Sequence, residues 1–201
     1  MAEDRGTILI AGALGAVGRC ALEHFEARPD WTIIGVSRRR PDFPTRAAWA
    51  SCDLRDRASV EAALGNLRDV THIAYAAVWE KPEVTRGWIE QEHVEANLAM
   101  LRNLVEVVEG ASPGLRHVTL MQGTKAYGGH LGPFRMPARE TDPRYMGPNF
   151  YYDQMDWLAE RQQGKGWSWT IFRPQLVCGI AVGSPLNIIT AMGVYAAISR
   201  E

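Results

Sequence analysis

With 201 residues, of which 46% are hydrophobic and 22% charged, the chain has the length and composition of one globular domain rather than of a disordered polypeptide. Its 22 lysine and arginine residues are balanced by 23 aspartate and glutamate residues, which argues against general binding to nucleic acid or to an anionic membrane. The three cysteines lie far apart, and the first ten residues lack the pattern of a secretory signal, so we expect a soluble cytoplasmic protein without a metal site.

Short β-rich runs alternate with stretches of helical periodicity along the chain. The six predicted strands span residues 7–11, 31–36, 48–52, 71–77, 117–121 and 169–172. The predicted helices between them span residues 16–27, 58–64, 90–109 and 150–162. Strands separated by helices build βαβ units, so the sequence predicts an α/β fold with a Rossmann-like, doubly wound parallel sheet.

A glycine-rich segment, GALGAVG, joins the first predicted strand to the first helix. Gly12 permits a tight turn, Gly15 allows the backbone to approach a pyrophosphate, and Gly18 allows close packing of the helix on the sheet. The N-terminus of the helix offers N–H groups to the anion. A glycine turn needed only for packing is the alternative. We expect the turn to bind a dinucleotide through Gly12, Leu14, Gly15, Ala16, Val17 and Gly18.

The second predicted strand ends in Ser37, Arg38 and Arg39. A site selective for NAD would place Asp or Glu here, to accept hydrogen bonds from the ribose hydroxyls. A hydroxyl and guanidinium groups instead suit a 2′-phosphate, through charge-assisted and bidentate hydrogen bonds. The alternative is a solvated basic turn. Together with the glycines, these residues favour NADP(H) as the cofactor.

The ends of the third and fourth strands add further candidate contacts. Asp53 and Leu54 follow the third strand, where a contact to the adenine edge is expected, although Asp53 could equally be a helix N-cap or a turn residue. Ala76 and Ala77 end the fourth strand, and their small side chains would let the cofactor lie close to the backbone. Small residues there could equally be packing choices.

The catalytic signature of ordinary short-chain dehydrogenases, Tyr-x-x-x-Lys on one helix, is absent, because no tyrosine has a lysine four positions further on. A lysine instead follows the fifth strand in the segment GTKAY, at position 125. The segment NFYYD, with tyrosines at positions 151 and 152, opens the next predicted helix.

This pattern resembles the progesterone 5β-reductase/iridoid synthase-like (PRISE) family of atypical extended short-chain dehydrogenases/reductases. Similar pieces occur in order over nearly the whole chain: GALGAVG, VSRR, CDLRD, DVTHIAY, GTKAYGGHLGPF, PNFYYDQMD, WSWTIFRP and GVYAAISRE. The resemblance implies that Lys125 and Tyr151 form the catalytic pair and, with Gln122, contact the cofactor. It also implies that the backbone of Leu176 and Val177 holds the nicotinamide carboxamide.

The resemblance implies an NADPH-dependent reductase of activated C=C bonds in enones or related small carbonyl compounds. A phenol can stabilise a developing enolate, while a nearby ammonium lowers the pKa of the phenol and anchors the nicotinamide ribose. Carbonyl reduction by the same pair, and sensing of NADP(H) without turnover, are the alternatives. Gln122 and Gln175 depart from the family pattern, and segment 75–79 has one additional residue, so the substrate stays open.

We assign residues 1–175 to an NADP-binding Rossmann domain and residues 176–201 to the start of a substrate-pocket or cap region. Members of the family continue beyond this point, so the cap is absent or reduced, or the chain is a fragment. Residues 186–198 are nearly all apolar, but Asn187 and Gly193 make a membrane span a poor interpretation. We expect this helix to face a substrate, a further C-terminal segment, or a second copy in a homodimer.

Overall fold

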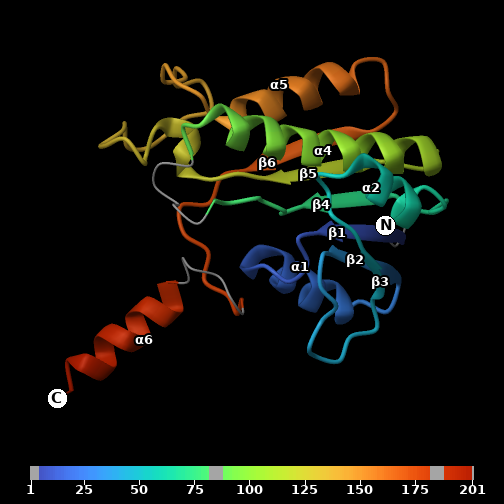
Figure 1. Ribbon diagram of the computed structural model, residues 1–201, viewed down its shortest axis with the longest axis horizontal. Helices are drawn as coiled ribbons and strands as arrows, with labels where there is room; N and C mark the ends of the chain where they lie inside the picture. Colours follow the sequence, from blue (N-terminus) through green and yellow to red (C-terminus); the bar gives the residue numbers. More distant parts are fainter. Residues whose placement is uncertain (1–4, 82–87, 182–187, 201) are drawn as a thin grey trace.

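A computed structural model describes residues 5–81, 88–181 and 188–200. Six parallel strands form one sheet in the order β3-β2-β1-β4-β5-β6 (Figure 1). This is the doubly wound Rossmann arrangement that the alternation of strands and helices predicts. The strands are β1 (Gly6–Ala11), β2 (Trp31–Ser37), β3 (Ala48–Ser51), β4 (His72–Tyr75), β5 (His117–Met121) and β6 (Ser168–Phe172).

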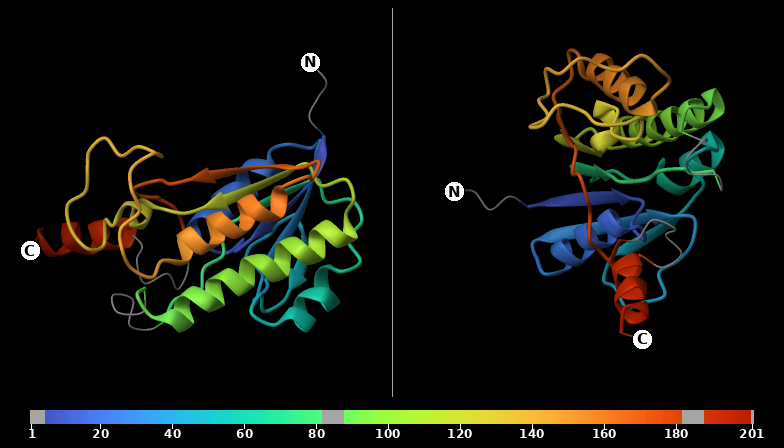
Figure 2. Two further views of the ribbon diagram at one scale, coloured as in Figure 1. Left: turned by 90° about the horizontal axis from the view of Figure 1, so that it is seen from above. Right: turned by 90° about the vertical axis from the view of Figure 1, so that its left-hand side faces the viewer.

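Helices lie on both faces of the sheet. The views in Figure 2 show α2, α4 and α5 on one face and α1 on the other. The predicted helices are confirmed to within two residues at each end. Their bounds, with those of the short 3-10 turn η1, are α1 (Ala16–Glu26), α2 (Arg57–Leu64), α4 (Gln91–Ala111), η1 (Thr124–Tyr127) and α5 (Phe150–Gln162).

Alternate residues of β1 serve the two halves of the core. Leu9 and Ala11 belong to the larger apolar cluster, which includes side chains of α2, α4 and α5. Ile8 and Ile10 belong to the smaller cluster, to which α1 contributes Leu22. Because successive strand residues point to opposite faces, the run TILIA supplies apolar side chains to both layers.

The carboxyl ends of the strands lie at one edge of the sheet, and the strand order reverses between β1 and β4. In open α/β sheets, ligands bind at this reversal point, in the crevice outside the carboxyl ends of the strands. The fold therefore places the turns after β1, β2, β4 and β5 along one edge of the sheet.

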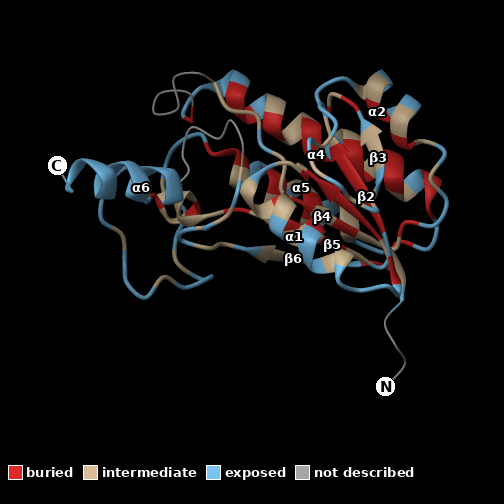
Figure 3. Cartoon of the chain, turned by 90° about the horizontal axis from the view of Figure 1, so that it is seen from below, coloured by how far each residue is buried: buried red, intermediate tan, exposed pale blue. Residues whose placement is uncertain are grey.

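The last helix, α6 (Ile188–Ile198), stands apart from the sheet, and none of its side chains is buried (Figure 3). Leu186 and Asn187, the first two residues of the predicted apolar helix, lie outside the described residues. In the part of the chain that the structure describes, no helix combines the length and apolarity needed to cross a membrane.

Candidate cofactor cleft and catalytic pair

A cleft of about 530 Å³ lies at the carboxyl ends of β1, β2, β3 and β4. Ten of the residues predicted to bind the cofactor line it: Gly12, Leu14, Gly15, Ser37, Arg38, Arg39, Asp53, Leu54, Ala76 and Ala77. The structure thus brings together the glycine turn, the basic turn and the ends of the third and fourth strands. Val78, Trp79, Glu80 and Lys81 extend the wall beyond β4.

The glycine turn is built for close backbone approach. Gly12 has a φ of +77°, and a Cβ there would lie 2.8 Å from the carbonyl oxygen of Ala76. A Cβ on Gly18 would lie 2.2 Å from the carbonyl oxygen of Gly12, so only glycine allows α1 to start this close to the strand end. Ala16, Val17 and Gly18 form the first turn of α1 rather than the cleft wall.

The N-terminus of α1 suits an anion. Gly15 is the N-cap residue, no side chain caps the helix, and its first turn contains no acidic residue. The N–H groups of such a helix start carry a partial positive charge. The expected interaction of this turn with a pyrophosphate fits this geometry.

The basic turn after β2 is held by its backbone and exposes its side chains. The Ser37 hydroxyl accepts a hydrogen bond from the Arg39 N–H at 3.3 Å, and the Trp49 indole donates to the Arg39 carbonyl oxygen at 2.9 Å. The side chains of Arg38 and Arg39 are exposed at the cleft. A phosphate in the cleft could therefore be reached by two guanidinium groups.

Asp53 does not cap a helix, because Asp56 is the N-cap of α2 and accepts a hydrogen bond from the Ala58 N–H at 3.0 Å. The Asp53 carboxylate instead forms an ion pair with Arg55, with 2.7 Å between Nη2 and Oδ2. The hydrogen bonds from Arg55 hold the pKa of Asp53 below its ordinary value, against the effect of burial. Arg55 was not among the residues predicted to form the site.

Asn97, a buried residue of α4, fixes the cleft wall after β4. Its side-chain amide accepts from the Trp79 N–H at 2.8 Å and donates to the Trp79 carbonyl oxygen at 2.9 Å. Gln154 of α5 in turn donates to the Asn97 carbonyl oxygen at 2.9 Å. The sequence could have indicated this contact, because Asn97 is a polar residue that lies between Val94 and Leu101 on the apolar face of the helix.

The two candidate catalytic residues are joined by the side chain of Asn149. Its Nδ2 donates to the carbonyl oxygen of Lys125 at 3.0 Å, and its Oδ1 accepts from the N–H of Tyr151 at 3.0 Å. Gln122, at the end of β5, donates to the Tyr151 carbonyl oxygen at 2.7 Å. The turn η1 and the start of α5 are thus held in fixed register, which brings Lys125 and Tyr151 to one place.

The Tyr151 hydroxyl lies close to Gly123, two residues after the end of β5. A Cβ placed on Gly123 would be 3.6 Å from the hydroxyl oxygen. Burial raises the pKa of Tyr151, and the charge of Glu80 raises it further. The expected lowering of this pKa by a nearby ammonium is therefore wrong for the chain as described, because burial dominates. Tyr151 is a neutral hydrogen-bond donor at ordinary pH.

Lys125 lies against an aromatic face rather than in solvent. Its Nζ is 3.4 Å from the centroid of the Trp88 ring. Burial lowers the pKa of Lys125 to about 8, although the charge of Glu80 acts in the opposite direction. Trp88 was not among the residues predicted to form the site, and residues 82–87, which precede it, lie outside the described residues.

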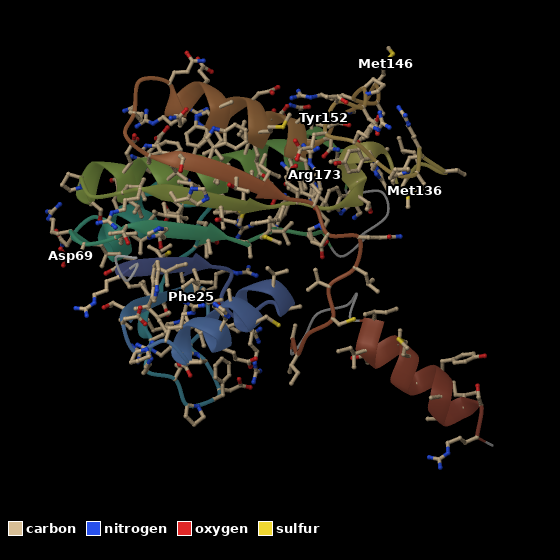
Figure 4. All side chains as sticks on the ribbon, turned by 180° about the vertical axis from the view of Figure 1, so that it is seen from behind. Phe25, Asp69, Met136, Met146, Tyr152 and Arg173 are labelled. Atoms are coloured by element: carbon tan, nitrogen blue, oxygen red, sulfur yellow. The ribbon has the colours of Figure 1, made fainter. Side chains whose placement is uncertain are left out.

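Tyr152 and Arg173, both labelled in Figure 4, form hydrogen bonds to residues next to the pair in the chain or in contact with it. The buried Tyr152 hydroxyl donates to the Ala126 carbonyl oxygen at 2.7 Å. Arg173, which follows β6, donates to the Gln122 side chain at 3.1 Å and to the Tyr127 hydroxyl at 3.3 Å. Gln122 is therefore occupied by protein partners on both sides, although it was predicted to contact the cofactor.

The segment after β6 contributes Ala181 to the cleft wall. Leu176, which is 62% exposed, and Val177 lie earlier in this segment and do not line the cleft. Their predicted contact with the carboxamide stays a prediction. Among the described residues, no group of three or more His, Cys, Asp and Glu side chains is arranged to hold a metal ion.

Solved structures with the same fold include a UDP-glucose 4-epimerase of Thermotoga maritima, with a TM-score of 0.68 and 16% identity, covering 83% of this chain and 54% of that chain. They also include WbmH of Bordetella bronchiseptica in complex with NAD+, with a TM-score of 0.69 and 20% identity, covering 96% of this chain and 63% of that chain. At these identities, the likeness shows the fold.

Curated relatives are more similar in sequence. The chain is 36% identical over 208 residues to an (S)-8-oxocitronellyl enol synthase of Nepeta cataria, and 36% identical over 211 residues to a 3-oxo-Δ4,5-steroid 5β-reductase of Arabidopsis thaliana. Each alignment covers 96% of this chain and 52% of the relative, so the chain spans about half the length of the curated relatives it matches. The family model of the PRISE-like Rossmann-fold domain matches residues 51–201. The resemblance noted in the sequence is thereby confirmed, and the chain belongs to the PRISE-like family of Rossmann-fold domains.

Proposed function

We propose that this chain binds NADPH and uses Tyr151 and Lys125 to reduce the activated C=C bond of an enone. One relative at 36% identity is named a reductase of 3-oxo-Δ4,5-steroids, which contain such a bond. The proposal extends that activity class to this chain and leaves the particular enone open.

The observation that carries the proposal is the bridge made by Asn149. Lys125 and Tyr151 are 26 positions apart and belong to different elements, yet one buried amide hydrogen-bonds to the backbone of both residues. A phenol and an amine whose backbones are held by one amide beside the carboxyl end of β5 would form a donor arrangement that stabilises a developing oxyanion.

The residues present fit a dinucleotide with a 2′-phosphate. The Gly12–Gly18 turn and the uncapped start of α1 would hold the pyrophosphate, and Arg38 and Arg39 would hold the 2′-phosphate. The cofactor would supply the hydride that adds to the β-carbon of the enone, and a proton from water would then add to the α-carbon of the enolate to give the saturated carbonyl compound.

The protein side of the reaction follows from the electrostatics of the pair. Tyr151 stays protonated, so its hydroxyl donates a hydrogen bond to the substrate oxygen, where negative charge develops. The Lys125 ammonium adds positive charge on the same side of the site. Both groups act more strongly at the transition state than in the ground state, so we expect them to affect kcat.

NADPH oxidation with paired enones and saturated ketones tests this function. We expect consumption of NADPH with the enones and recovery of the saturated carbonyl product. Consumption with the ketones instead would assign carbonyl reduction to the same pair. Tight NADPH binding without turnover on either class of compound would indicate a cofactor-sensing protein.

A homodimer and a cytoplasmic location stay predictions from the sequence.

A further inference from the structure

Trp88 is a buried residue, with 5% of its surface exposed, that contacts both members of the proposed catalytic pair. Its ring centroid lies 3.4 Å from Lys125 Nζ and 5.3 Å from the ring centroid of Tyr151. Its indole N–H has no hydrogen-bond partner within the described ranges. The position of this ring is therefore fixed by aromatic and cation–π contacts rather than by a hydrogen bond from the indole N–H.

Two fully buried aromatic residues, Phe150 and His93, are among the ring neighbours of Trp88. The ring of Phe150 lies 4.8 Å from it and the ring of His93 lies 5.3 Å from it, centroid to centroid. Phe150 and His93 are 2% and 0% exposed, so neither can turn out to solvent without opening this cluster. The face of Trp88 is thus presented to Lys125 by a rigid support.

The cation–π contact with the Trp88 ring is the main attractive interaction of the Lys125 ammonium. In the described part of the chain, Lys125 forms no ion pair with a carboxylate. Glu80 acts on Lys125 through its charge. Burial lowers the pKa values of the neighbouring His93 and His130, and the charge of Lys125 also acts to lower both. These imidazoles are neutral at ordinary pH, and Tyr151 is neutral as well.

We propose that Trp88 is a positioning residue for this reaction, whose ring face holds the Lys125 ammonium beside the Tyr151 hydroxyl. A cation over the face of tryptophan is the strongest of the cation–π pairs, and it gains most where water is excluded. The catalytic meaning of the contact rests on the proposed function, whereas the contact itself can be measured without turnover.

Nuclear magnetic resonance of lysine side chains tests the contact in the intact chain. The sequence contains only three lysines, Lys81, Lys125 and Lys165, so selective labelling with 13C and 15N gives a spectrum simple enough to assign with a Lys125→Arg variant. In the wild type, ring-current shielding should move the Lys125 Hε signals well upfield of those of Lys165, whose ammonium pairs with Glu109. Lys125 should also titrate near pH 8. Coincident Lys125 and Lys165 signals would overturn the inference without any Trp88 variant.

Trp88→Leu and Trp88→Phe form a matched pair, because both keep an apolar cover over Lys125 but only Phe keeps an aromatic face. Loss of the face removes an interaction that favours the charged amine, so the Lys125 midpoint should fall by about one pH unit in Trp88→Leu. In Trp88→Phe it should stay close to the wild-type value. Equal midpoints in the two variants would contradict the proposal.

Turnover separates this inference from the proposed function. If both hold, the pH midpoint of kcat/KM for enone reduction moves with the Lys125 midpoint in Trp88→Leu and is restored in Trp88→Phe. A normal lysine response in a protein that reduces no enone would overturn the proposed function and leave the Trp88–Lys125 contact supported. A changed Lys125 midpoint with an unchanged activity profile would overturn the positioning role.

Discussion

Tyr151 and Tyr152 are neighbours with the same side chain, yet their hydroxyl groups have different surroundings. Successive residues of a helix point about 100° apart, since one turn takes 3.6 residues. Tyr152 therefore directs its hydroxyl to the Ala126 carbonyl oxygen, while the Tyr151 hydroxyl lies beside Gly123. The Tyr152 hydroxyl is therefore engaged by the protein, whereas the Tyr151 hydroxyl is left for a substrate.

This difference predicts opposite effects of removing each hydroxyl. Tyr151→Phe should lower kcat for the enone by about 100-fold or more, the usual effect of losing one oxyanion donor, and leave the Kd for NADPH nearly unchanged. Tyr152→Phe should keep most of kcat and lower the free energy of unfolding by about 1–2 kcal/mol, because it loses the buried hydrogen bond to the Ala126 carbonyl oxygen and the longer one from the Tyr145 N–H. Steady-state kinetics, cofactor titration and urea unfolding measure the three quantities. The reverse order of effects on kcat would assign the catalytic role to Tyr152.

Arg38 and Arg39 set the expected preference for NADPH. Replacing both by alanine should weaken NADPH binding by about 10- to 100-fold, because one or two charge-assisted hydrogen bonds to the 2′-phosphate are lost. NADH binding should hardly change. Fluorescence titration of both cofactors measures this, and Arg40→Ala serves as the control, because Arg40 is an exposed arginine of the same turn that does not line the cleft. Equal affinity of the wild type for NADH and NADPH would remove the argument.

At the scale of elements, α4, α5 and the turn before β6 are joined by one carboxylate. Glu109, near the end of α4, accepts hydrogen bonds from the Trp167 indole at 3.0 Å and from Arg161 Nε at 2.8 Å. Lys165 Nζ lies 3.2 Å from the same carboxylate. Burial acts to raise the pKa of Glu109, but these three donors outweigh it and hold the pKa below its ordinary value.

A carboxylate with a lowered pKa in the folded state stabilises the fold fully above its unfolded pKa of 4.5, and this stabilisation is lost as pH falls through the lower folded value. Glu109→Gln should therefore reduce the free energy of unfolding by about 2 kcal/mol near neutral pH, since the amide cannot satisfy three donors. The difference from wild type should shrink below pH 4.5. Urea unfolding across this range measures it, with the exposed change Glu95→Gln as the control. A pH-independent difference would show that charge is not the cause.

Local patterns were enough to predict the elements, and the differences at their ends have tertiary causes. The fourth strand was predicted over residues 71–77, but β4 ends at Tyr75. Ala76 still donates to the Ala11 carbonyl oxygen, and then the chain turns so that Asn97 can pair with the backbone of Trp79. The turn is held by Asn97, which is 18 positions after Trp79 in the sequence. The pattern of apolar residues within the strand therefore could not predict where the strand ends.

The candidate site shows the same division. The glycine turn, the basic turn and the FYY motif were found because each is a contiguous pattern, and the structure gathers them at one edge of the sheet. The ion pair of Arg55 with Asp53 and the contact of Trp88 with Lys125 were not predicted. They depend on how the backbone folds after β3 and on how the segments that contain Trp88 and Lys125 meet. The sequence contains the partners but no regular spacing that joins them.

At the scale of the whole molecule, the two faces of the sheet are covered unequally within the described ranges. Three helices cover one face, whereas α1 is the helix that packs on the other (Figure 2). Strand residues on the α1 side of β5 and β6, such as Thr119 and Thr170, remain partly exposed, and Phe172 is 54% exposed. The apolar helix α6 stands apart from this body.

The exposed apolar surface of α6 predicts that the 201-residue chain associates in solution. Met192, Tyr195 and Ile198 are 64%, 75% and 69% exposed, and apolar patches of this kind usually mark contact sites. Light scattering should show a mass that rises with protein concentration, while NADPH still binds, because the cleft lies on the sheet. Met192→Lys/Tyr195→Lys should shift the chain toward the monomer without changing the Kd for NADPH.

The matched control is Thr190→Lys/Ser199→Lys, which adds the same two charges at exposed polar positions, one inside α6 and one directly after its last residue. Lysine is a good helix former at the three positions inside α6, and position 199 lies beyond the helix, so a difference between the two variants reports the apolar side chains rather than charge or helix stability. Association that persists in Met192→Lys/Tyr195→Lys would place the contact elsewhere on the molecule. A wild-type chain that stays monomeric at every concentration would show that α6 is stable in water with its apolar side chains exposed.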